Sequence, residues 1–226
     1  MRSDVCLNHK FFEELVDTIS PADIPAFLSN FKDMNVLYSC AIREVTTKLE
    51  NLNQELTYSQ HHNPIHQISH RIKHPESIAK KMQRKNLPLD YKTAQQEIHD
   101  IAGIRVICPY IQDIYDVAAM LTKQDDITLL EQKDYIIAPK ESGYRSLHLI
   151  ITVPVFLSEK THIVPVEVQI RTIAMDFWAS LEHQLRYKTT VNIPEDIRKH
   201  LKEISKNMYQ NDLDMQQMYQ TIYQLE

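Results

Sequence analysis

Basic side chains gather in one short segment of an otherwise acidic chain. Residues 71–85 contain six Lys or Arg and a single carboxylate, a local charge of +5, whereas the whole chain of 226 residues has 25 basic and 30 acidic side chains and a net charge of −5. On a helix that begins near Pro75, several polar side chains share one face or enter just before it, namely Arg71, Lys73, Ser77, Lys81 and Arg84. This grouping suits a polyphosphate ligand, and a solvated basic helix is the alternative.

Two carboxylates stand where a sheet can bring them together. Asp100 precedes the β-branched apolar run 102–108, and Glu167 lies in the alternating segment 166–171. In that segment, apolar side chains point to one face, and a carboxylate, an amide and a guanidinium point to the other. Paired carboxylates near phosphate-binding cations are typical of a Mg²⁺ site for phosphoryl-group transfer, although two acids on one sheet can also be unrelated.

The composition excludes several function classes. Only 2 glycines are present, which rules out the glycine-rich G-x-G-x-x-G and Walker A phosphate loops. The 3 cysteines are far apart with no C-x-x-C pair, and no apolar stretch approaches the roughly 18 residues that span a membrane. We therefore expect a cytoplasmic protein with no membrane partner. The negative net charge also disfavours a stable nucleic-acid partner.

Hydrophobic periodicity predicts a single domain, residues 1–226, of the α/β (α+β) class. Extended and helical patterns alternate through the middle of the chain, at residues 102–108, 111–123, 127–131, 147–153 and 166–171. This order favours a mixed β-sheet flanked by helices. Thr172 can cap a further helix, whose apolar stripe is expected at Ile173, Phe177, Leu181 and Leu185.

Long helices are expected on both sides of a core at about residues 60–190, in the flanks 1–59 and 191–226. Apolar side chains recur with steps of three and four in each flank, and each seam contains one asparagine, Asn35 or Asn211. Such long seams predict a homo-oligomer assembled through these helices. Packing of the helices on the sheet of their own chain is the alternative.

The two glycines indicate special backbone positions. A chain so poor in glycine is expected to keep Gly103 and Gly143 where φ is positive or where another segment approaches closely, with a plain turn as the alternative. Tyr144 follows Gly143 directly. It is placed to stack on a nucleobase, although a tyrosine can also simply pack.

Four ordered motifs resemble the synthetase domain of the RelA/SpoT homologue family. They are Asp100-Ile-Ala-Gly-Ile-Arg105, Gly143-Tyr-Arg-Ser-Leu-His148, Glu167-Val-Gln-Ile-Arg-Thr172 and Phe177-Trp-Ala-Ser-Leu-Glu-His183. The short chain is similar to the single-domain small alarmone synthetases, and His62-Asn-Pro-Ile-His66 leans toward the RelP-like branch. The resemblance implies a nucleotidyltransferase-like synthetase fold with long N- and C-terminal helices, and a tetramer.

The resemblance further implies transfer of the β,γ-pyrophosphate of ATP to the ribose 3′-hydroxyl of GDP or GTP, giving ppGpp or pppGpp and AMP. It implies that Asp100 and Glu167 bind Mg²⁺ and that Glu167 accepts the 3′-hydroxyl proton. The residues implied for ATP are Arg71, Lys73, Ser77, Lys81, Arg84 and Arg105. Those implied for GDP or GTP are Tyr144, which stacks on guanine, with Lys140, His148, Gln169 and Glu182.

Two positions depart from the family pattern. His70 stands where relatives often have glycine before the arginine that corresponds to Arg71, so a stiffer loop is expected there. Asp176 stands where relatives of the other small branch have asparagine. Its negative charge is expected to disfavour extra phosphates on the acceptor if it faces them.

Other function classes remain open at this point. A metal-dependent phosphohydrolase is suggested by His99 and Asp100, but such a site needs further His and Asp ligands on separate helices. A non-enzymatic RNA-binding module would use residues 71–85 and Tyr144, and the negative charge of the chain weakens it. A pyrophosphokinase of the same fold that acts on adenine nucleotides or on the tRNA 3′ end is a third alternative.

Four histidines, His62, His66, His70 and His74, are spaced by four residues. On a helix this spacing aligns imidazoles for a zinc ion. Pro64 and Pro75 interrupt such a helix, which favours structural or exposed histidines and leaves zinc binding as a hypothesis.

Overall fold

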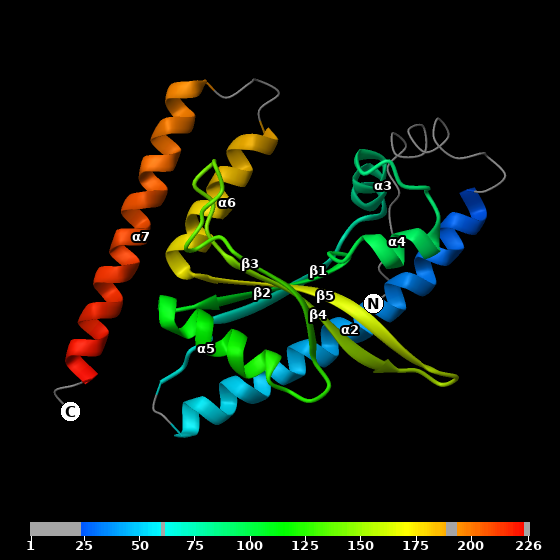
Figure 1. The fold of residues 1–226 in the computed structure, drawn as a ribbon, viewed down its shortest axis with the longest axis horizontal. Coiled ribbons are helices and arrows are strands. Elements are labelled where there is room, and N and C mark those ends of the chain that lie inside the picture. The colour runs from blue at the N-terminus through cyan, green and yellow to red at the C-terminus, as the bar shows by residue number, and fades with distance from the viewer. Residues whose placement is uncertain (1–23, 60–61, 189–193, 224–226) are drawn as a thin grey trace.

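The computed structural model describes residues 24–59, 62–188 and 194–223, which form one mixed sheet with helices on both faces (Figure 1). The sheet order is β1-β2-β5-β4-β3. Its strands are β1 (Gln67–Ile72), β2 (Ala102–Cys108), β3 (Thr128–Asp134), β4 (Leu147–Phe156) and β5 (Thr161–Thr172). The helices are α2 (Ile24–Ser59), α3 (Pro75–Arg84), α4 (Tyr91–Glu97), α5 (Ile111–Thr122), α6 (Ile173–Lys188) and α7 (Glu195–Tyr223). The expected mixed-sheet α+β fold is confirmed.

The register of the sheet brings the motif residues into line. β2 and β5 run parallel, with Gly103 opposite Glu167 and Arg105 opposite Gln169. The other neighbouring strands are antiparallel. Because Asp100 lies just before β2, it falls at the same end of the sheet as Glu167.

The prediction that the first strand is 102–108 was wrong, since β1 precedes it. β1 reads Gln-Ile-Ser-His-Arg-Ile and has no fully buried member. It pairs with β2 on one side only, as an edge strand does, so its pattern is mostly polar. The pairing sets Arg71 opposite Gly103.

The core lies on one face of the sheet. Along β5, Val164, Val166, Val168 and Ile170 are at most 1% exposed, whereas the residues between them are more accessible. Helices α2 and α5 cover this face (Figure 1). Each such side chain contributes about 1.5–3 kcal/mol to stability when fully buried. The apolar face of the strand is therefore the one that packs, and the polar side chains lie on the opposite face.

Helix α2 packs on the sheet of its own chain, which was the alternative to assembly of an oligomer through this helix. Its seam residues Tyr38, Ile42, Val45 and Leu49 are at most 3% exposed and belong to the main core. Asn35 is half-buried. The side chains of the seam before residue 34 lie outside the described part.

The apolar stripes of α6 and α7 are instead partly exposed. On α6, Phe177 of the expected stripe is 55% exposed, whereas the neighbouring Trp178 is 4% exposed. On α7, seam members such as Met218 are exposed, and the buried face carries Ser205 and Asp212. The last seam residue, at 225, lies outside the described residues.

Candidate active site

The thirteen side chains for which the sequence predicts a role line one open cleft of about 1100 Å³. Its lining includes residues of α3 and of α6. These two helices lie on the side of the sheet opposite α2 and α5 (Figure 1). The side toward β1 and α3 contributes Arg71, Lys73, Ser77, Lys81, Arg84, Asp100 and Arg105. The side toward β4, β5 and α6 contributes Lys140, Tyr144, His148, Glu167, Gln169 and Glu182.

Helix α3 turns its cations to the cleft because its sequence is amphipathic. Ile78 and Met82 are at most 2% exposed and anchor the helix to the core. Ser77 and Lys81, one turn apart, line the cleft. Pro75 begins the helix as expected, where a missing backbone N–H costs nothing.

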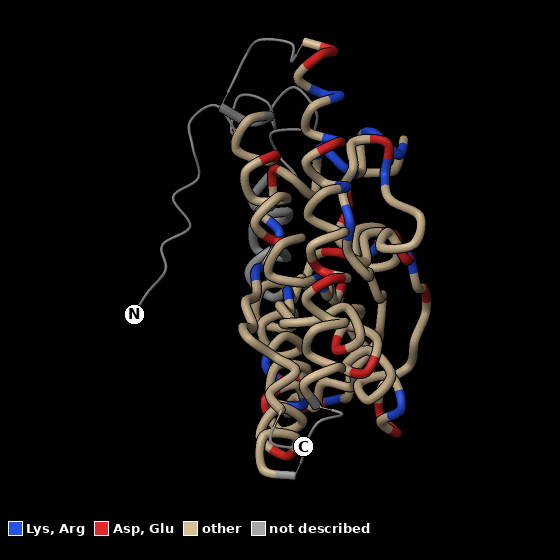
Figure 2. Tube along the Cα trace, turned by 90° about the vertical axis from the view of Figure 1, so that its left-hand side faces the viewer, with Lys and Arg blue, Asp and Glu red and all other residues tan. Residues whose placement is uncertain are grey.

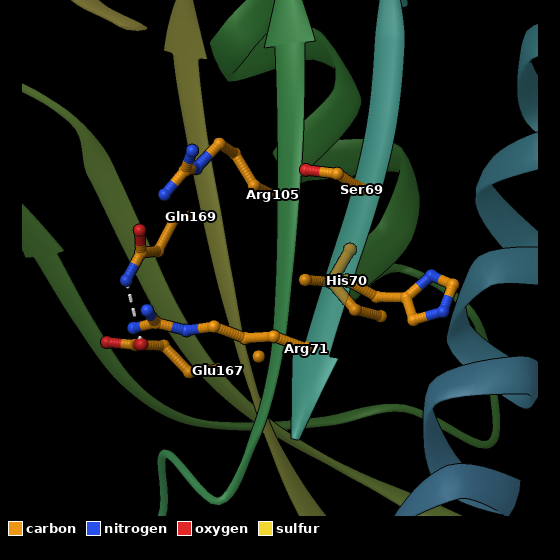
Figure 3. A pocket seen from close by; sticks show the side chains of 8 residues that line it. Ser69, His70, Arg71, Arg105, Glu167 and Gln169 are labelled. Carbon is orange, nitrogen blue, oxygen red and sulfur yellow. Dashed lines mark hydrogen bonds between the residues drawn. The ribbon is translucent and has the colours of Figure 1, made fainter. Parts of the chain in front are cut away.

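A smaller pocket of about 200 Å³ lies where β1, β2 and β5 meet (Figure 3). The side chain of Arg71 passes beside Gly103, its partner in the sheet, and extends toward Glu167 (Figure 3). A Cβ added at Gly103 would stand 3.6 Å from Cγ of Arg71, an ordinary contact. The positive φ considered for Gly103 is not found, whereas Gly143 has φ of 96°.

His70 does not stiffen a loop, as had been expected, because it lies within β1. Its ring points away from the other labelled side chains, toward α2 (Figure 3). The residue that replaces glycine here therefore leaves the path of Arg71 across the sheet open.

Asp100 is held by two of the predicted phosphate-binding lysines. Its Oδ2 lies 2.8 Å from Nζ of Lys73 and 2.9 Å from Nζ of Lys81. Burial alone would raise the pKa of Asp100, but the two ammonium groups outweigh it and hold the pKa below its ordinary value. The carboxylate is therefore ionised at neutral pH.

The other oxygen of Asp100, Oδ1, is buried and has no hydrogen-bond partner. Mg²⁺ is usually held by one or two carboxylates together with substrate phosphates. An ionised carboxylate with one unused oxygen, beside cations suited to phosphates, matches that requirement. Within the described ranges, no three His, Cys, Asp or Glu side chains converge as metal ligands, so the phosphohydrolase alternative finds no ligand set there.

Both oxygens of Glu167 accept hydrogen bonds. Oε1 lies 3.1 Å from Nδ1 of His148, and Oε2 lies 2.8 Å from Nε2 of Gln169. Burial would raise the pKa of Glu167, but its hydrogen bonds with His148 and Gln169 hold that pKa below its ordinary value. The negative charge of Asp100 acts in the opposite direction and raises the pKa of Glu167.

Arg171 closes these contacts into a ring of hydrogen bonds. Its Nη2 donates to the Tyr144 hydroxyl at 2.8 Å and to Oε1 of Gln169 at 2.7 Å. The Tyr144 hydroxyl in turn lies 2.8 Å from Nε2 of His148. The carboxylate of Glu167 can only accept, so Nδ1–H of His148 donates to it, and Nε2 of the neutral imidazole then accepts the proton of the Tyr144 hydroxyl. Two branches from one guanidinium thus converge on one carboxylate.

Arg171 was missed as a site residue, although the alternation of its strand had placed a guanidinium on the polar face. It lines the cleft and is only 2% exposed. Lys133 and Tyr135 also line the cleft without having been predicted. The predicted extended segment ended at residue 131, whereas β3 continues to Asp134. The sequence pattern therefore did not place Lys133 or Tyr135 near the site.

The ring of Tyr144 is flanked by cations. Nζ of Lys140 lies 4.8 Å from its centroid, and the guanidinium carbon of Arg171 lies 5.3 Å from it. Burial raises the pKa of Tyr144, so its hydroxyl keeps its proton. Burial also lowers the pKa of Lys140. This half of the cleft presents an aromatic face beside fixed positive charge, which suits a nucleotide base and its phosphates.

Asp176, on the first turn of α6, joins two arginines of the cleft. Its Oδ1 lies 3.3 Å from Nη1 of Arg105 and 3.3 Å from Nη1 of Arg171. The carboxylate thus faces cations that a phosphate would otherwise use, and it partly neutralises them.

The histidine tract does not form a helix. His62 pairs with Asp113 at 2.7 Å, His70 lies in β1, and His74 precedes α3. The described histidines are thus spread along a loop and a strand. Among them and their described neighbours no metal cluster is found, so the zinc hypothesis gains no support.

Several known proteins are similar to this chain in sequence and in fold. A family profile described as "Region found in RelA / SpoT proteins" matches residues 70–192. GTP pyrophosphokinase YwaC of Bacillus subtilis (strain 168) is 43% identical over 181 residues, which cover 80% of this chain and 86% of that protein.

Two solved structures extend the comparison. Small alarmone synthetase 1 from Bacillus subtilis bound to its product pppGpp matches with a TM-score of 0.77 and 37% identity, covering 85% of this chain and 97% of that one. The same synthetase bound to AMPCPP matches with a TM-score of 0.74 and 32% identity, covering 86% and 98%.

Proposed function

The chain belongs to the family of RelA/SpoT proteins, and we propose on this basis that its cleft is the active site of a small alarmone synthetase. The enzyme transfers pyrophosphate from ATP to the ribose 3′-hydroxyl of GDP or GTP and releases AMP. One observation carries the assignment: Lys73 and Lys81, with Asp100, stand across the same cleft from Tyr144 and Glu167. Cations for a polyphosphate and an aromatic face for a second base thus flank a pair of carboxylates.

The two halves of the cleft divide the substrates. ATP lies on the side of α3, where Lys73, Lys81 and Arg84 surround its phosphates and Arg71 and Arg105 border the adenosine. The relative solved with AMPCPP supports a nucleotide of this size in the fold. The acceptor lies on the side of β4 and α6, and the relative bound to pppGpp supports a guanine nucleotide.

Glu167 acts on the acceptor hydroxyl. The 3′-oxygen forms a bond to the β-phosphorus of ATP, the bond from that phosphorus to the α-phosphate oxygen breaks, and AMP leaves. The proton of the 3′-hydroxyl passes to the carboxylate of Glu167, which its low pKa keeps ionised beforehand. The donors His148 and Gln169 fix the orientation of this carboxylate.

Asp100, through the unused Oδ1, and Glu167, which lines the same cleft, are the residues that would hold Mg²⁺. When bound, the ion neutralises charge on the phosphates as the transfer proceeds. Lys73 and Lys81, which hold Asp100 in the free protein, contribute the remaining positive charge around the same phosphates.

One assay tests the function. The protein is incubated with Mg²⁺, labelled ATP and each of GDP, GTP, GMP, ATP and tRNA, and the products are resolved by chromatography. We expect AMP and a pyrophosphorylated guanine nucleotide in equal amounts, with AMP release dependent on GDP or GTP. Transfer to ATP or tRNA instead would show the same fold working on another acceptor, and no transfer to any acceptor would reject the function.

We also propose that the protein works as a homotetramer assembled through α6 and α7. Both helices carry exposed apolar side chains between 43% and 61% accessible, namely Ile173, Phe177, Leu181 and Leu185 on α6, with Ile197, Met215, Met218 and Ile222 on α7. Apolar patches of this extent are typical of interaction sites. Helix α2 is not available for the same role along its seam, because that seam is buried within the chain.

The expected compartment is the cytoplasm. The described cysteines, Cys40 and Cys108, are free thiols, as in a reducing environment. No helix among residues 24–59, 62–188 and 194–223 has the length and apolar character needed to cross a bilayer.

A further inference from the structure

We propose that helix α7 holds the loop of residues 140–146 in place, so that Ser205 and Tyr209, which lie outside the cleft, set the affinity for the acceptor nucleotide. This loop carries Lys140 and Tyr144 into the cleft. The inference rests on the proposed function for the identity of the acceptor. It assigns to Ser205 and Tyr209 a positioning role and no contact with either substrate.

The first contact joins Ser205 to the backbone of the loop. Its hydroxyl donates to the carbonyl oxygen of Gly143, and the serine is only 6% exposed. Within the loop, the N–H of Gly143 donates to the carbonyl of Lys140 at 2.8 Å, and that of Lys140 donates to the carbonyl of Tyr144 at 3.1 Å. The bond from α7 therefore holds this tight turn by the carbonyl directly before Tyr144.

The close approach of α7 explains why residue 143 is glycine. A Cβ there would stand 3.0 Å from Cβ of Ser205 and 3.3 Å from the backbone Cα of Lys202. The φ of 96° at Gly143 is itself unfavourable for other residues. One of only 2 glycines in the chain is thus placed where the loop meets α7.

The second contact lies on the other side of Tyr144. The guanidinium carbon of Arg145 stands 4.0 Å from the ring centroid of Tyr209, within cation–π range. Arg145 also donates to the carbonyl of Ile136, at the start of the same connection between β3 and β4. Tyr144 is therefore bracketed by two residues that are each held by α7.

Helix α7 is itself fixed to the body of the domain. The indole N–H of Trp178 donates to the carbonyl of Leu201 at 2.9 Å. Two turns beyond Ser205 and one turn beyond Tyr209, Asp212 accepts a hydrogen bond from Thr172 at 2.6 Å. These bonds tie α7 to α6 and to the end of β5, so the loop is held by an anchored element.

The outer side of α7 is accessible in the single chain, and the tetramer proposed above covers its apolar part. The N-terminal half of α7 carries its four Lys and Arg residues together with Glu195, Asp196 and Glu203, and Asp212 and Asp214 follow (Figure 2). Met215 and Met218 are more than half exposed. A shift of α7 would move the loop of residues 140–146 through Ser205 and Tyr209. Neither of these contacts involves a residue on the α3 side of the cleft.

The competing explanation is that these contacts only stabilise the fold. A loss of stability lowers the active fraction and affects both substrates alike, whereas a misplaced acceptor loop raises KM for one substrate. The separation of the two KM values therefore distinguishes the explanations.

The test uses Ser205→Ala and Tyr209→Leu in the full chain. Ser205→Ala removes one hydroxyl, and Tyr209→Leu removes the aromatic face while keeping apolar volume. We expect KM for GDP to rise about 5- to 20-fold and KM for ATP to stay within about twofold. Tyr209→Phe keeps the ring face and is expected to restore the wild-type value. Lys206→Ala and Gln210→Ala, on the exposed side of α7, serve as matched controls.

Fluorescence of Trp178, the single tryptophan, reports whether α7 stays docked on α6. With unchanged emission, equal rises of both KM values, or unchanged KM values, in Ser205→Ala overturn the proposal. An altered emission in Tyr209→Leu would mean that α7 is displaced in that variant. The KM values of Ser205→Ala alone then test the proposal. Wild-type protein that makes no product from GDP or GTP would reject the proposed function instead, and the dissociation constant of GDP by calorimetry then tests the loop directly with the same variants.

Discussion

The hydroxyl of Tyr144 lies 2.8 Å from Nε2 of His148, and Nδ1 of the same imidazole lies 3.1 Å from Glu167. The residue expected to stack on guanine is therefore connected, through one histidine, to the carboxylate expected to take the proton. Arg171 donates to the Tyr144 hydroxyl, and the proton of that hydroxyl remains available to a neutral His148, whose Nδ1–H donates to Glu167. The ring of Tyr144 and its hydroxyl consequently serve different purposes.

Two substitutions of Tyr144 separate these purposes. Tyr144→Ala removes the stacking face, which contributes about 1–3 kcal/mol per base, and should raise KM for the guanine nucleotide far more than KM for ATP. Tyr144→Phe keeps the face and removes one hydrogen bond. It should lower kcat by about 3- to 10-fold with KM for GDP nearly unchanged. Steady-state kinetics with each substrate varied in turn measure both effects. An unaltered kcat in Tyr144→Phe would show that the hydroxyl plays no part.

Arg171→Lys keeps a positive charge but loses the planar fork that serves Tyr144 and Gln169 together. Glu167 then loses its fixed orientation, and kcat should fall about 100-fold, the size of effect that a misplaced catalytic group produces. KM for ATP should change little. Arg43→Lys, at an exposed position on α2, is the matched control. Full activity in a folded Arg171→Lys protein would contradict the role of the ring.

Much of the site was predictable because its residues follow strong local rules. Strict alternation in 166–171 gave the polar face of β5, and Pro75 with the basic residues after it gave the start and the cleft-facing side of α3. The motifs then placed Asp100 and Tyr144. The alternation gives the face on which each polar side chain lies but not its hydrogen-bond partners. The sequence therefore placed Arg171 on the correct face without predicting its bonds to Tyr144 and Gln169.

The errors arose where long-range pairing decides the structure. β1 is mostly polar and becomes a strand only because it pairs with β2. β4 and β5 run past the predicted ends despite Pro154 and Pro165. These prolines lie just beyond the residues that pair with β3 and β2, so neither removes a hydrogen bond that an outer neighbour needs.

The exposed stripe of α6 shows a similar limit. Spacing identified Ile173, Phe177 and Leu181 as one face, but it does not say which face turns inward. Trp178 is buried because its indole reaches the carbonyl of Leu201 on α7, a contact between segments far apart in sequence.

A buried acid makes the stability of the protein depend on pH. Burial raises the pKa of Asp212 from 3.8 to about 6, so the folded state binds this proton more tightly than the unfolded state. The stabilisation by this proton is complete below pH 3.8 and is lost as the pH rises through about 6. Asp212→Asn removes the buried charge and can still accept from Thr172. At about pH 8 this substitution should increase the free energy of unfolding by roughly 2 kcal/mol, which corresponds to a melting temperature about 4–8 °C higher. At about pH 5 the increase should be much smaller.

Thermal melting followed by circular dichroism at the two pH values measures this difference. Asp116→Asn, which is exposed on α5, is the control. An Asp212→Asn variant that is less stable at both pH values would mean that the ionised carboxylate stabilises the fold.

Assembly is tested on the outer face of α7. Met215→Glu combined with Met218→Glu places charges in the proposed interface and should dissociate the tetramer without unfolding the chain. Asn211→Leu, a more apolar seam, should strengthen association or change its stoichiometry. Sedimentation equilibrium gives the mass directly. A wild-type monomer of 26.6 kDa at micromolar concentration would contradict the oligomer.

The central claim is that Glu167 in this cleft carries out pyrophosphate transfer to a guanine nucleotide. The most direct measurement compares AMP and ppGpp formation by wild-type protein and by Glu167→Gln, with nucleotide binding followed by calorimetry. Glutamine keeps the size of the side chain and removes the charge and the proton acceptor. We predict product from the wild type, a loss of more than about tenfold, or 1.4 kcal/mol, in Glu167→Gln, and binding largely retained. A Glu167→Gln enzyme that keeps more than about a tenth of the wild-type rate would contradict the account.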